Sequence, residues 1–444
     1  MLSAGFSKVS ISPALGAPLA GFAARQGVCE GIHDELFARA LVLENNGKSI
    51  VFIGLDVLAV SSEFVNRVRA KIERRTGIPE NAVMIASTHT HAGPVTVKTF
   101  FNPEGTLDPD YMNSLAQAIE DSVSEAWGKR FPARAGVGSG FVSGIGVNRR
   151  TPDKKPIDEE IGIIKIEDAN GKLRAVFINY ACHPTVLGSD NLLATGDFPN
   201  FAVEKIEQAI GADSFAMFVN GTQGNISVGH SSELSAIGVI TPGRTFENAA
   251  ELGYKLANAT LEALSDISTK DSCELSAAIF LVNFPLKDLP EIEKSAQTFR
   301  KAKEDLARLS QTEAVPEVLM KAKSQLLYAS ITNFYAQETA SLDGHLPVEL
   351  QAFRIGETVF LAVPAEVFVE IGLELKRRAA HKTFIAGIAN GYIGYFPTQT
   401  AYADGGYEVV SSKIAPQSES VFYREAIKLE EQLFSSPAEV VSVG

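Results

Sequence analysis

The chain has 444 residues, of which 45% are hydrophobic and 21% charged, so a folded protein with a sizeable core is expected and dominant disorder is excluded. The net charge of -13 disfavours general nucleic-acid binding and adhesion to anionic lipid, because both need basic surface. Three cysteines are too few for a disulfide framework, and no segment reads as a signal peptide or a membrane span. A cytoplasmic protein is therefore expected, or a secreted one if a leader has been removed.

Strand and helix signals alternate along the first 264 residues. An apolar run at 50–55 predicts a buried strand that ends at Asp56, and helical periodicity follows at 62–75. The alternation predicts an α/β protein with a mixed β-sheet core covered by helices. Further strands are expected at 82–86, 161–166, 175–180 and 215–219, with a helix at 249–264.

A stretch at about 290–336 differs in composition from the rest. It is rich in Ala, Lys, Glu and Leu with helical periodicity, and a short polar break at 310–312 divides it. This pattern predicts a helical hairpin that projects from the sheet or packs over it, with a structural rather than catalytic role. A strand signal resumes at 358–363, so residues 1–444 are interpreted as a single domain that contains the hairpin as an insertion.

Two histidines, His89 and His91, directly follow the strand expected at 82–86. If the extended conformation persists, both imidazoles point to the same face near the carboxyl end of the strand, where α/β proteins often bind ligands. Such a pair can also be purely structural. It cannot hold zinc alone, since zinc needs three or four N, O or S ligands.

His183 and Glu366 are the next candidates, because each follows an apolar strand near a proline. Taken alone, a histidine such as His183 is more often a satisfied structural group, and the repeated strand-end context favours a functional role. Glu366 is expected in the opening turn of a helix, where it either complements the helix dipole or acts as an oxygen ligand. The carboxylates Asp56 and Asp197 are candidates for orienting the histidines.

A glycine-containing loop, 220–227, ends in Ser227. This serine could be a nucleophile, an oriented donor or a turn residue. It lacks the G-x-S-x-G elbow, so a Ser-His-Asp hydrolase is not indicated. His230 is close enough in sequence to reach the same pocket.

Taken together, these motifs resemble the neutral/alkaline (non-lysosomal) ceramidase family, through its catalytic domain. The matching segments run in order along almost the whole chain. They include Ala20-Gly21-Phe22, residues 31–40, Ser87-Thr88-His89-Thr90-His91-Ala92-Gly93-Pro94, Asn148-Arg149, Cys182-His183-Pro184-Thr185, Gly224-Asn225-Ile226-Ser227, Val363-Pro364-Ala365-Glu366 and Asn390-Gly391-Tyr392-Ile393-Gly394-Tyr395.

The resemblance implies a role for each matching position. It makes His91 a catalytic partner beside the metal, and Ser227 the position of the serine described as the family's nucleophile. Substrate-contacting positions are implied at Gly21, Arg149, Tyr402 and Tyr407, and Zn²⁺ ligands at His89, His183, Glu366 and Tyr395.

The function expected from this resemblance is a zinc-dependent hydrolase of lipid metabolism that cleaves an amide bond by attack of a zinc-activated water. The substrate is expected to be an N-acyl amide or a ceramide-like molecule. The chain departs from the family at 224–229, shows no leader and has no residues for a C-terminal immunoglobulin-like domain. These departures favour a smaller, more soluble amide.

Three alternatives stay open. The HxH pair also occurs in TIM-barrel amidohydrolases, although strands precede the pair here. An esterase or lactonase could use the same zinc site, and a binding protein could keep the fold without catalysis. The sequence does not predict acyl-chain length, oligomeric state, pathway or the role of Ser227.

Overall fold

The computed structural model describes residues 1–100, 107–312 and 314–435, and a large mixed sheet forms its centre. The strand order is β11-β9-β8-β6-β1-β3-β4-β5, with parallel pairs β4–β5 and β9–β11 among antiparallel neighbours. Its strands are β1 (Ser3–Ser10), β3 (Phe37–Asn45), β4 (Lys48–Leu55), β5 (Val83–Ser87), β6 (Phe131–Phe141), β8 (Glu160–Asp168), β9 (Leu173–Tyr180) and β11 (Phe215–Asn220).

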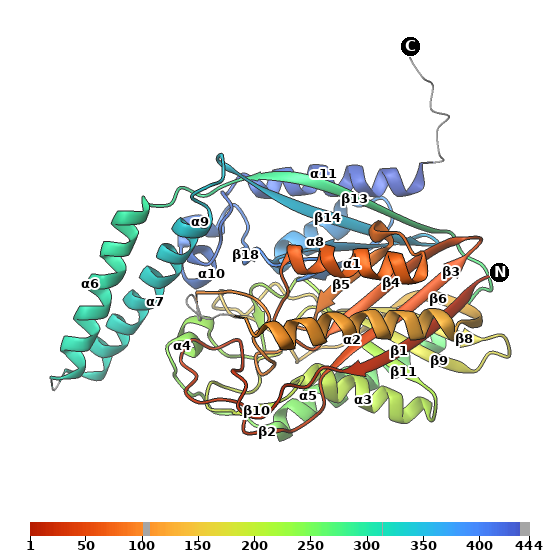
Figure 1. Cartoon of the computed structure of the whole chain (residues 1–444), viewed down its shortest axis with the longest axis horizontal. Helices are drawn as coiled ribbons and strands as arrows, with labels where there is room; N and C mark the ends of the chain where they lie inside the picture. Colours follow the sequence, from red (N-terminus) through yellow and green to blue (C-terminus); the bar gives the residue numbers. More distant parts are fainter. Residues whose placement is uncertain (101–106, 313, 436–444) are drawn as a thin grey trace, which may run out of the picture.

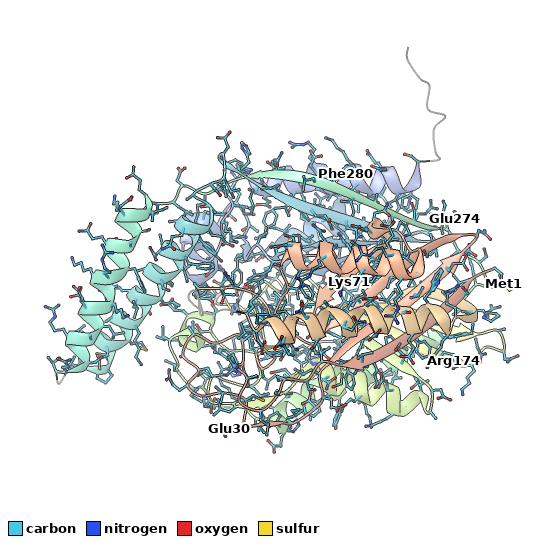
Figure 2. The ribbon with its side chains drawn as sticks, viewed as in Figure 1. Met1, Glu30, Lys71, Arg174, Glu274 and Phe280 are labelled. Carbon is cyan, nitrogen blue, oxygen red and sulfur yellow. The ribbon has the colours of Figure 1, made fainter. Side chains whose placement is uncertain are left out.

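A second sheet, in the order β13-β14-β15-β17, packs face to face on the first. Phe52 of the large sheet contacts Phe353 and Phe360 of the smaller one, with ring centroids 5.2 and 5.4 Å apart, and side chains fill the space between the layers (Figure 2). Aromatic pairs of this kind bury large apolar areas. The strands are β13 (Leu275–Pro285), β14 (His345–Ile355), β15 (Thr358–Val363) and β17 (Lys382–Gly387).

Helices cover the outer faces of both sheets (Figure 1). On the large sheet they bury one of the two alternating side-chain sets of each strand, while the other set faces the second sheet. The outer helices are α1 (Ser62–Thr76), α2 (Pro109–Gly128), α3 (Phe198–Ile210) and α5 (Phe246–Ala263) on the large sheet, and α8 (Val369–Arg378) and α11 (Ser418–Phe434) on the small one.

The predicted α/β class with a mixed sheet covered by helices is confirmed by this arrangement. Within the range expected for the hairpin, α6 (Ile292–Ser310) and α7 (Pro316–Glu338) lie side by side and project from the body (Figure 1). Within the described part of the hairpin, the C-terminal half of α7 reaches the body's core, through Leu327, Ile331 and Tyr335. The single-domain boundaries stay a prediction. Among the described helices, none is long and apolar enough to cross a membrane.

Loops at the carboxyl ends of the parallel strands meet at one edge of the two sheets. Ser87 N donates to the Ile388 carbonyl, and the Asn220 side chain donates to the Thr88 carbonyl, so loops from both sheets are tied together. Such an edge is where α/β proteins bind ligands. The short elements at and around it are β2 (Gly31–Ile32), β7 (Val147–Asn148), β10 (Leu193–Ala194), β12 (Ile226–Ser227), β16 (Glu366–Val367), β18 (Tyr395–Phe396), α4 (Ser232–Ala236), α9 (Ala401–Asp404) and α10 (Tyr407–Val410), and the 3-10 turns are Glu80–Ala82 and Leu264–Asp266.

Candidate metal centre

Three buried side chains from three separate loops form a cluster with the donor atoms of a metal site. His89 follows β5, His183 follows β9, and Glu366 lies in β16 just after β15. One potential ligand atom of each lies within 4.8 Å of the others. The sequence singled out these three residues separately, and the fold brings them together.

His89 reaches the cluster by a different backbone path from the one expected. Its φ of +70° is left-handed, so the strand conformation does not persist through the pair, and the condition for a shared strand face is not met. Such a conformation is strained for a residue with a Cβ and is typical of functional sites. The rings of His89 and His91 still converge, with centroids 4.9 Å apart.

Backbone carbonyls orient the two ligand imidazoles. Nδ1 of His89 lies 2.8 Å from the Leu58 carbonyl, and Nδ1 of His183 lies 2.7 Å from that of Gln223 and 2.9 Å from that of Ile226. Because a carbonyl oxygen can only accept, both Nδ1 atoms carry hydrogen and donate. Each Nε2 is thereby directed to the cluster, the arrangement that tunes metal-bound histidines.

The electrostatics of the cluster fit a cation. Nε2 of His183 lies 2.8 Å, and Nε2 of His89 3.5 Å, from the same Glu366 oxygen. Burial lowers the pKa of His183 to about 4, so this ring is neutral at pH 7 and turns a lone pair toward the carboxylate. Two lone-pair donors and a carboxylate facing one point are stabilised by a positive ion between them. The residues present therefore fit a divalent metal.

Strand pairing, and not a helix, places Glu366. It pairs in parallel register with Tyr395 through β16 and β18, whereas α8 begins only at Val369. The expected position in the first turn of a helix is therefore wrong, and Glu370 is the acidic residue of that turn. Tyr392 donates its hydroxyl to Glu366 Oε1 at 2.6 Å, which fixes the second carboxylate oxygen.

Arg149 connects Tyr395 to the surrounding loops. Its Nη2 donates to the Tyr395 hydroxyl at 3.0 Å and to the Gly224 carbonyl at 2.8 Å, while its Nε pairs with Glu408 at 2.8 Å. Burial raises the pKa of Tyr395 well above its usual value, and Arg149 opposes this shift. The register with Glu366 and the contact with Arg149 together hold the Tyr395 ring beside the cluster.

His91 lies against the cluster with unused hydrogen-bonding capacity. Both of its ring nitrogens are buried and have no hydrogen-bond partner among the described residues. Burial lowers its pKa well below the usual value, which favours the neutral ring. Gly21, with φ +100°, packs on it so closely that an added Cβ would lie 2.5 Å from His91 Cβ and Cγ. An unpartnered buried imidazole at this place is available to a ligand.

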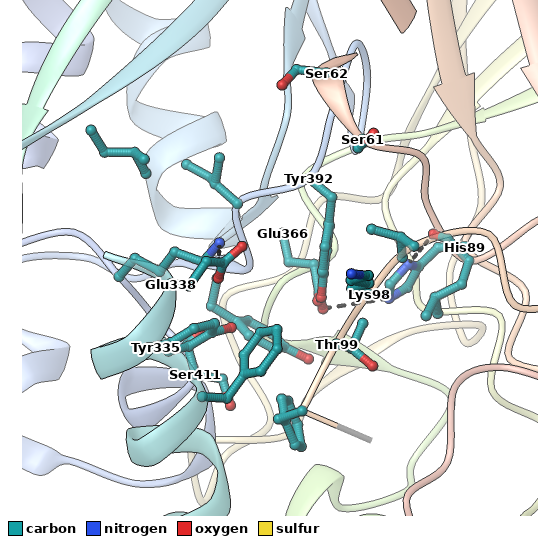
Figure 3. Close-up of a pocket in the computed structure, with 18 of the residues that line it drawn as sticks. Ser61, Ser62, His89, Lys98, Thr99, Tyr335, Glu338, Glu366, Tyr392 and Ser411 are labelled. Atoms are coloured by element: carbon teal, nitrogen blue, oxygen red, sulfur yellow. Dashed lines mark hydrogen bonds and ion pairs between the residues drawn. The ribbon is translucent and has the colours of Figure 1, made fainter. Parts of the chain in front are cut away.

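A cavity of about 440 Å³ opens from the cluster toward α7. Figure 3 shows Glu366, Tyr392 and His89 on one side and Tyr335 and Glu338 of α7 on the other. The volume falls in the range of small-molecule sites, and the wall mixes apolar and charged groups. The helical hairpin therefore contributes to the site, which its composition did not predict. Apolar lining comes from Leu58, Val97, Phe334, Leu346, Pro347 and Ile393, and polar or charged lining from Ser61, Ser62, Glu63, Lys98, Ser411 and Lys413.

Of the remaining predicted positions, one lines this cavity and two do not. Tyr407 lines it, whereas the Tyr402 hydroxyl donates to the Ile414 carbonyl at 2.6 Å. Ser227 is fully buried, and its hydroxyl donates to the His230 carbonyl at 2.8 Å. Neither Tyr402 nor Ser227 lines the cavity, so their expected roles stay predictions.

Motif reading missed Tyr392, Tyr335 and Glu338 as site residues. Tyr392 was inside a matching motif, and its position three residues before Tyr395 was the only available signal. Nothing in the pattern of α7 marks Tyr335 or Glu338 as cavity residues, since a single sequence does not show where a helix docks.

Asp56 and Asp197, the two carboxylates expected to orient the histidines, instead bind backbone N–H groups of loops. Asp197 accepts backbone N–H groups of Val186, at 3.3 Å, and Leu187, at 3.1 Å, and so anchors the loop after His183. Asp56 accepts the Phe37 N–H at 2.9 Å, next to the segment whose carbonyls bind His89.

Asp56 gives a pH-dependent stability. Burial raises its pKa to about 6, against the opposing charge of Arg39. A carboxyl with a raised folded-state pKa stabilises the fold below pH about 4 and loses that contribution as the pH rises through 6. Asp56→Asn keeps an acceptor for Phe37 but removes the charge. We expect the change in free energy of unfolding caused by this substitution to be about 1–3 kcal/mol more favourable at pH 8 than at pH 4. Urea unfolding at both pH values measures this. The exposed Asp288→Asn serves as control, and equal pH dependence in Asp56→Asn and the unmodified protein would contradict the assignment.

Comparison with known proteins agrees with the resemblance read from the motifs. The sequence model of the family described as neutral/alkaline non-lysosomal ceramidase, N-terminal, matches residues 4–233. The neutral ceramidase of Pseudomonas aeruginosa is 24% identical over 475 residues, covering 93% of this chain and 70% of the relative. Neutral ceramidase 2 of Arabidopsis thaliana is 28% identical over 233 residues, covering 48% of this chain and 30% of the relative.

The fold comparison leads to the same group. The crystal structure of neutral ceramidase from Pseudomonas aeruginosa superimposes with a TM-score of 0.77 at 23% sequence identity, covering 99% of this chain and 76% of that one. The match extends over both sheets and their helices. At this level of identity the likeness establishes a shared fold.

Proposed function

The chain belongs to the neutral/alkaline non-lysosomal ceramidase family and is a hydrolase, and we propose that it cleaves the amide bond of an N-acyl amide or ceramide-like substrate with the help of a metal ion. The observation that carries this proposal is the buried cluster of His89, His183 and Glu366 beside the cavity. Two imidazole nitrogens and a carboxylate at one point are a poor structural arrangement without a cation and a good one with it.

For the metal we propose Zn²⁺, held by His89, His183 and Glu366, with Tyr395 as the fourth ligand. Imidazole nitrogen and carboxylate oxygen are donors that zinc accepts readily in catalytic sites. When bound, the ion supplies a Lewis acid for the scissile carbonyl and lowers the pKa of a water molecule. The Tyr392 hydroxyl holds the second Glu366 oxygen, so the carboxylate has one oxygen for the cluster.

The chain's own residues supply orientation and proton transfer. His91, with two buried ring nitrogens free of partners in the described part of the chain, would accept a proton from the attacking water on a ring nitrogen and pass it to the leaving amine nitrogen. Arg149 holds the Tyr395 hydroxyl in place, and its own charge is balanced by Glu408. For Ser227 we propose a positioning role, because its hydroxyl holds the His230 carbonyl.

The cavity favours an amphiphilic amide. Apolar residues such as Leu58 and Leu346 suit an acyl or alkyl chain, and the Lys413–Glu338 ion pair, at 2.7 Å, lies at the polar part of the wall. Excluding water from the apolar part gains roughly 0.8 kcal/mol for each buried methylene of a substrate. A cytoplasmic location stays a prediction from the sequence.

Metal removal tests the proposal. We expect purified protein to contain about one zinc per chain by elemental analysis and to hydrolyse some members of an N-acyl amide series graded from acetyl to palmitoyl. Chelation should abolish hydrolysis and added Zn²⁺ should restore it. Undiminished hydrolysis by metal-free protein would contradict the metal-dependent mechanism. Cleavage of esters but of no amide would show that the site is an esterase site.

A further inference from the structure

A second and much smaller cavity, of about 30 Å³, touches the metal cluster on another side. His183, Tyr395 and His91 line it toward the cluster, and His230 and Ser235 line it elsewhere. Its volume has room for about one or two water-sized groups. We call this space, whose lining includes His91, His183, Tyr395, His230, Ser235 and Arg149, the small chamber.

The contacts around His230 support an assignment of the ring nitrogen that carries hydrogen. Arg244 Nε donates to the Thr241 hydroxyl oxygen at 3.2 Å, and that hydroxyl lies 2.8 Å from His230 Nδ1. The Thr241 oxygen accepts from Arg244 and can donate its own hydrogen to Nδ1; we assign this arrangement, in which Nδ1 is the acceptor. In the neutral ring the hydrogen is then on Nε2.

The ring is held as an uncharged donor. Burial, followed by the charge of Arg244, lowers the pKa of His230 to about 4. The backbone is fixed as well, because Ser227 donates its hydroxyl to the His230 carbonyl at 2.8 Å. His230 is therefore a rigid neutral imidazole that presents one N–H.

That N–H has no partner in the described part of the chain. His230 is only 8% exposed, and its Nε2 is buried without a hydrogen bond. An unsatisfied buried donor costs about 1–3 kcal/mol, so a ligand oxygen in the chamber would recover this loss. Arg149, the cation of the chamber wall, is already neutralised by Glu408 at 2.8 Å. The arrangement favours an uncharged oxygen over an anion.

We propose that His230 is a specificity-determining residue whose Nε2–H binds a hydroxyl group next to the scissile amide of the substrate. This inference rests on the proposed amide hydrolysis and names the substrate feature that the small chamber selects. Only a group of one or two heavy atoms fits, so the hydroxyl lies within two carbons of the amide, while longer parts of the substrate occupy the large cavity.

The test compares substrates that differ by one hydroxyl. One pair is a 2-hydroxyacyl amide and its unsubstituted acyl amide; the other carries the hydroxyl on the amine side. We expect the protein to prefer the hydroxylated member of one pair by about 10- to 100-fold in kcat/KM. His230→Phe, which keeps the ring shape without the donor, should bring the ratio near one. His230→Gln, whose amide can replace the Nε2–H, should retain most of the preference.

Controls separate this inference from the proposed function. The exposed histidine variant His345→Phe should leave the ratio unchanged, and circular dichroism checks that each variant is folded. If no amide is cleaved, calorimetric titration of zinc-loaded protein with both members of each pair measures the binding preference directly. A failure of amide hydrolysis therefore leaves the role of His230 testable. A preference that persists in folded His230→Phe, or no preference in either pair, overturns the assignment.

Discussion

Glu366→Gln is expected to lose most of its bound metal and at least about 10³-fold in kcat/KM, on the order of 4 kcal/mol of transition-state stabilisation. Glutamine has nearly the same shape and can still accept the Tyr392 hydroxyl, so packing around the site is preserved. What disappears is the negative charge opposite the two Nε2 lone pairs of His89 and His183. The substitution therefore isolates the electrostatic contribution to cation binding.

Elemental analysis and hydrolysis of an N-acyl amide measure the two effects in the same preparation. Glu374→Gln is the matched control, because this carboxylate lies on the nearby helix α8 and pairs with Arg377 and Arg378 at the surface. We expect the control to keep its metal and its activity within about twofold, as surface changes usually have small effects. Full metal content with unchanged kcat/KM in Glu366→Gln would exclude Glu366 as a ligand.

The positions of the ligand histidines were predictable because their signals are local. His89 and His183 each follow an apolar strand, and strand ends collect functional residues in α/β proteins. Their meeting at one point was not predictable from periodicity. It depends on parallel pairing within two sheets and on packing between the sheets, which are contacts between distant segments. The ordered motifs of a known family supplied that information instead.

Tyr395 shows most clearly the difference between what local sequence patterns predict and what the family resemblance adds. No pattern in its neighbourhood marks a tyrosine as a metal ligand, and only the resemblance indicated it. The structure gives a physical reason for its place: the parallel register of β16 and β18 sets Tyr395 opposite Glu366. A two-residue strand pair is too short to leave a periodic signal in a sequence.

Backbone conformation was the least predictable property of the site. The left-handed φ of His89 breaks the strand-like alternation on which the prediction of a shared face was based. Its ring is directed by the Leu58 carbonyl, and its position by hydrogen bonds such as His89 N to the Val57 carbonyl at 3.1 Å. Tertiary hydrogen bonds of this kind override the local preference, as they often do at functional sites.

Gly21→Ala is expected to lower kcat/KM by about 10²-fold without loss of metal, because it acts on His91 and not on the ligands. An added Cβ would lie 2.5 Å from His91 Cβ and Cγ, closer than such atoms approach. The two segments cannot separate easily, since Ala20 N donates to the Gly93 carbonyl at 2.8 Å and Arg25 donates to the His91 carbonyl at 2.7 Å. The contact includes the His91 Cα, at 2.6 Å, so the His91 backbone must shift and carry the imidazole with it. Small displacements of a proton-transferring group are costly.

Gly16→Ala is the matched control for backbone strain. Gly16 has φ +86°, similar to the +100° of Gly21, but nothing lies within 4 Å of an added Cβ. Both variants should lose about 1 kcal/mol in free energy of unfolding from the left-handed alanine, and Gly21→Ala somewhat more from the contact. Only Gly21→Ala should lose activity, with zinc content equal to that of the control. A fully active Gly21→Ala would show that His91 is not the proton-transferring group that its position implies. A loss of zinc in proportion to the loss of activity would show that the close contact supports the metal ligands. The separation of roles between His89 and His91 would then be wrong.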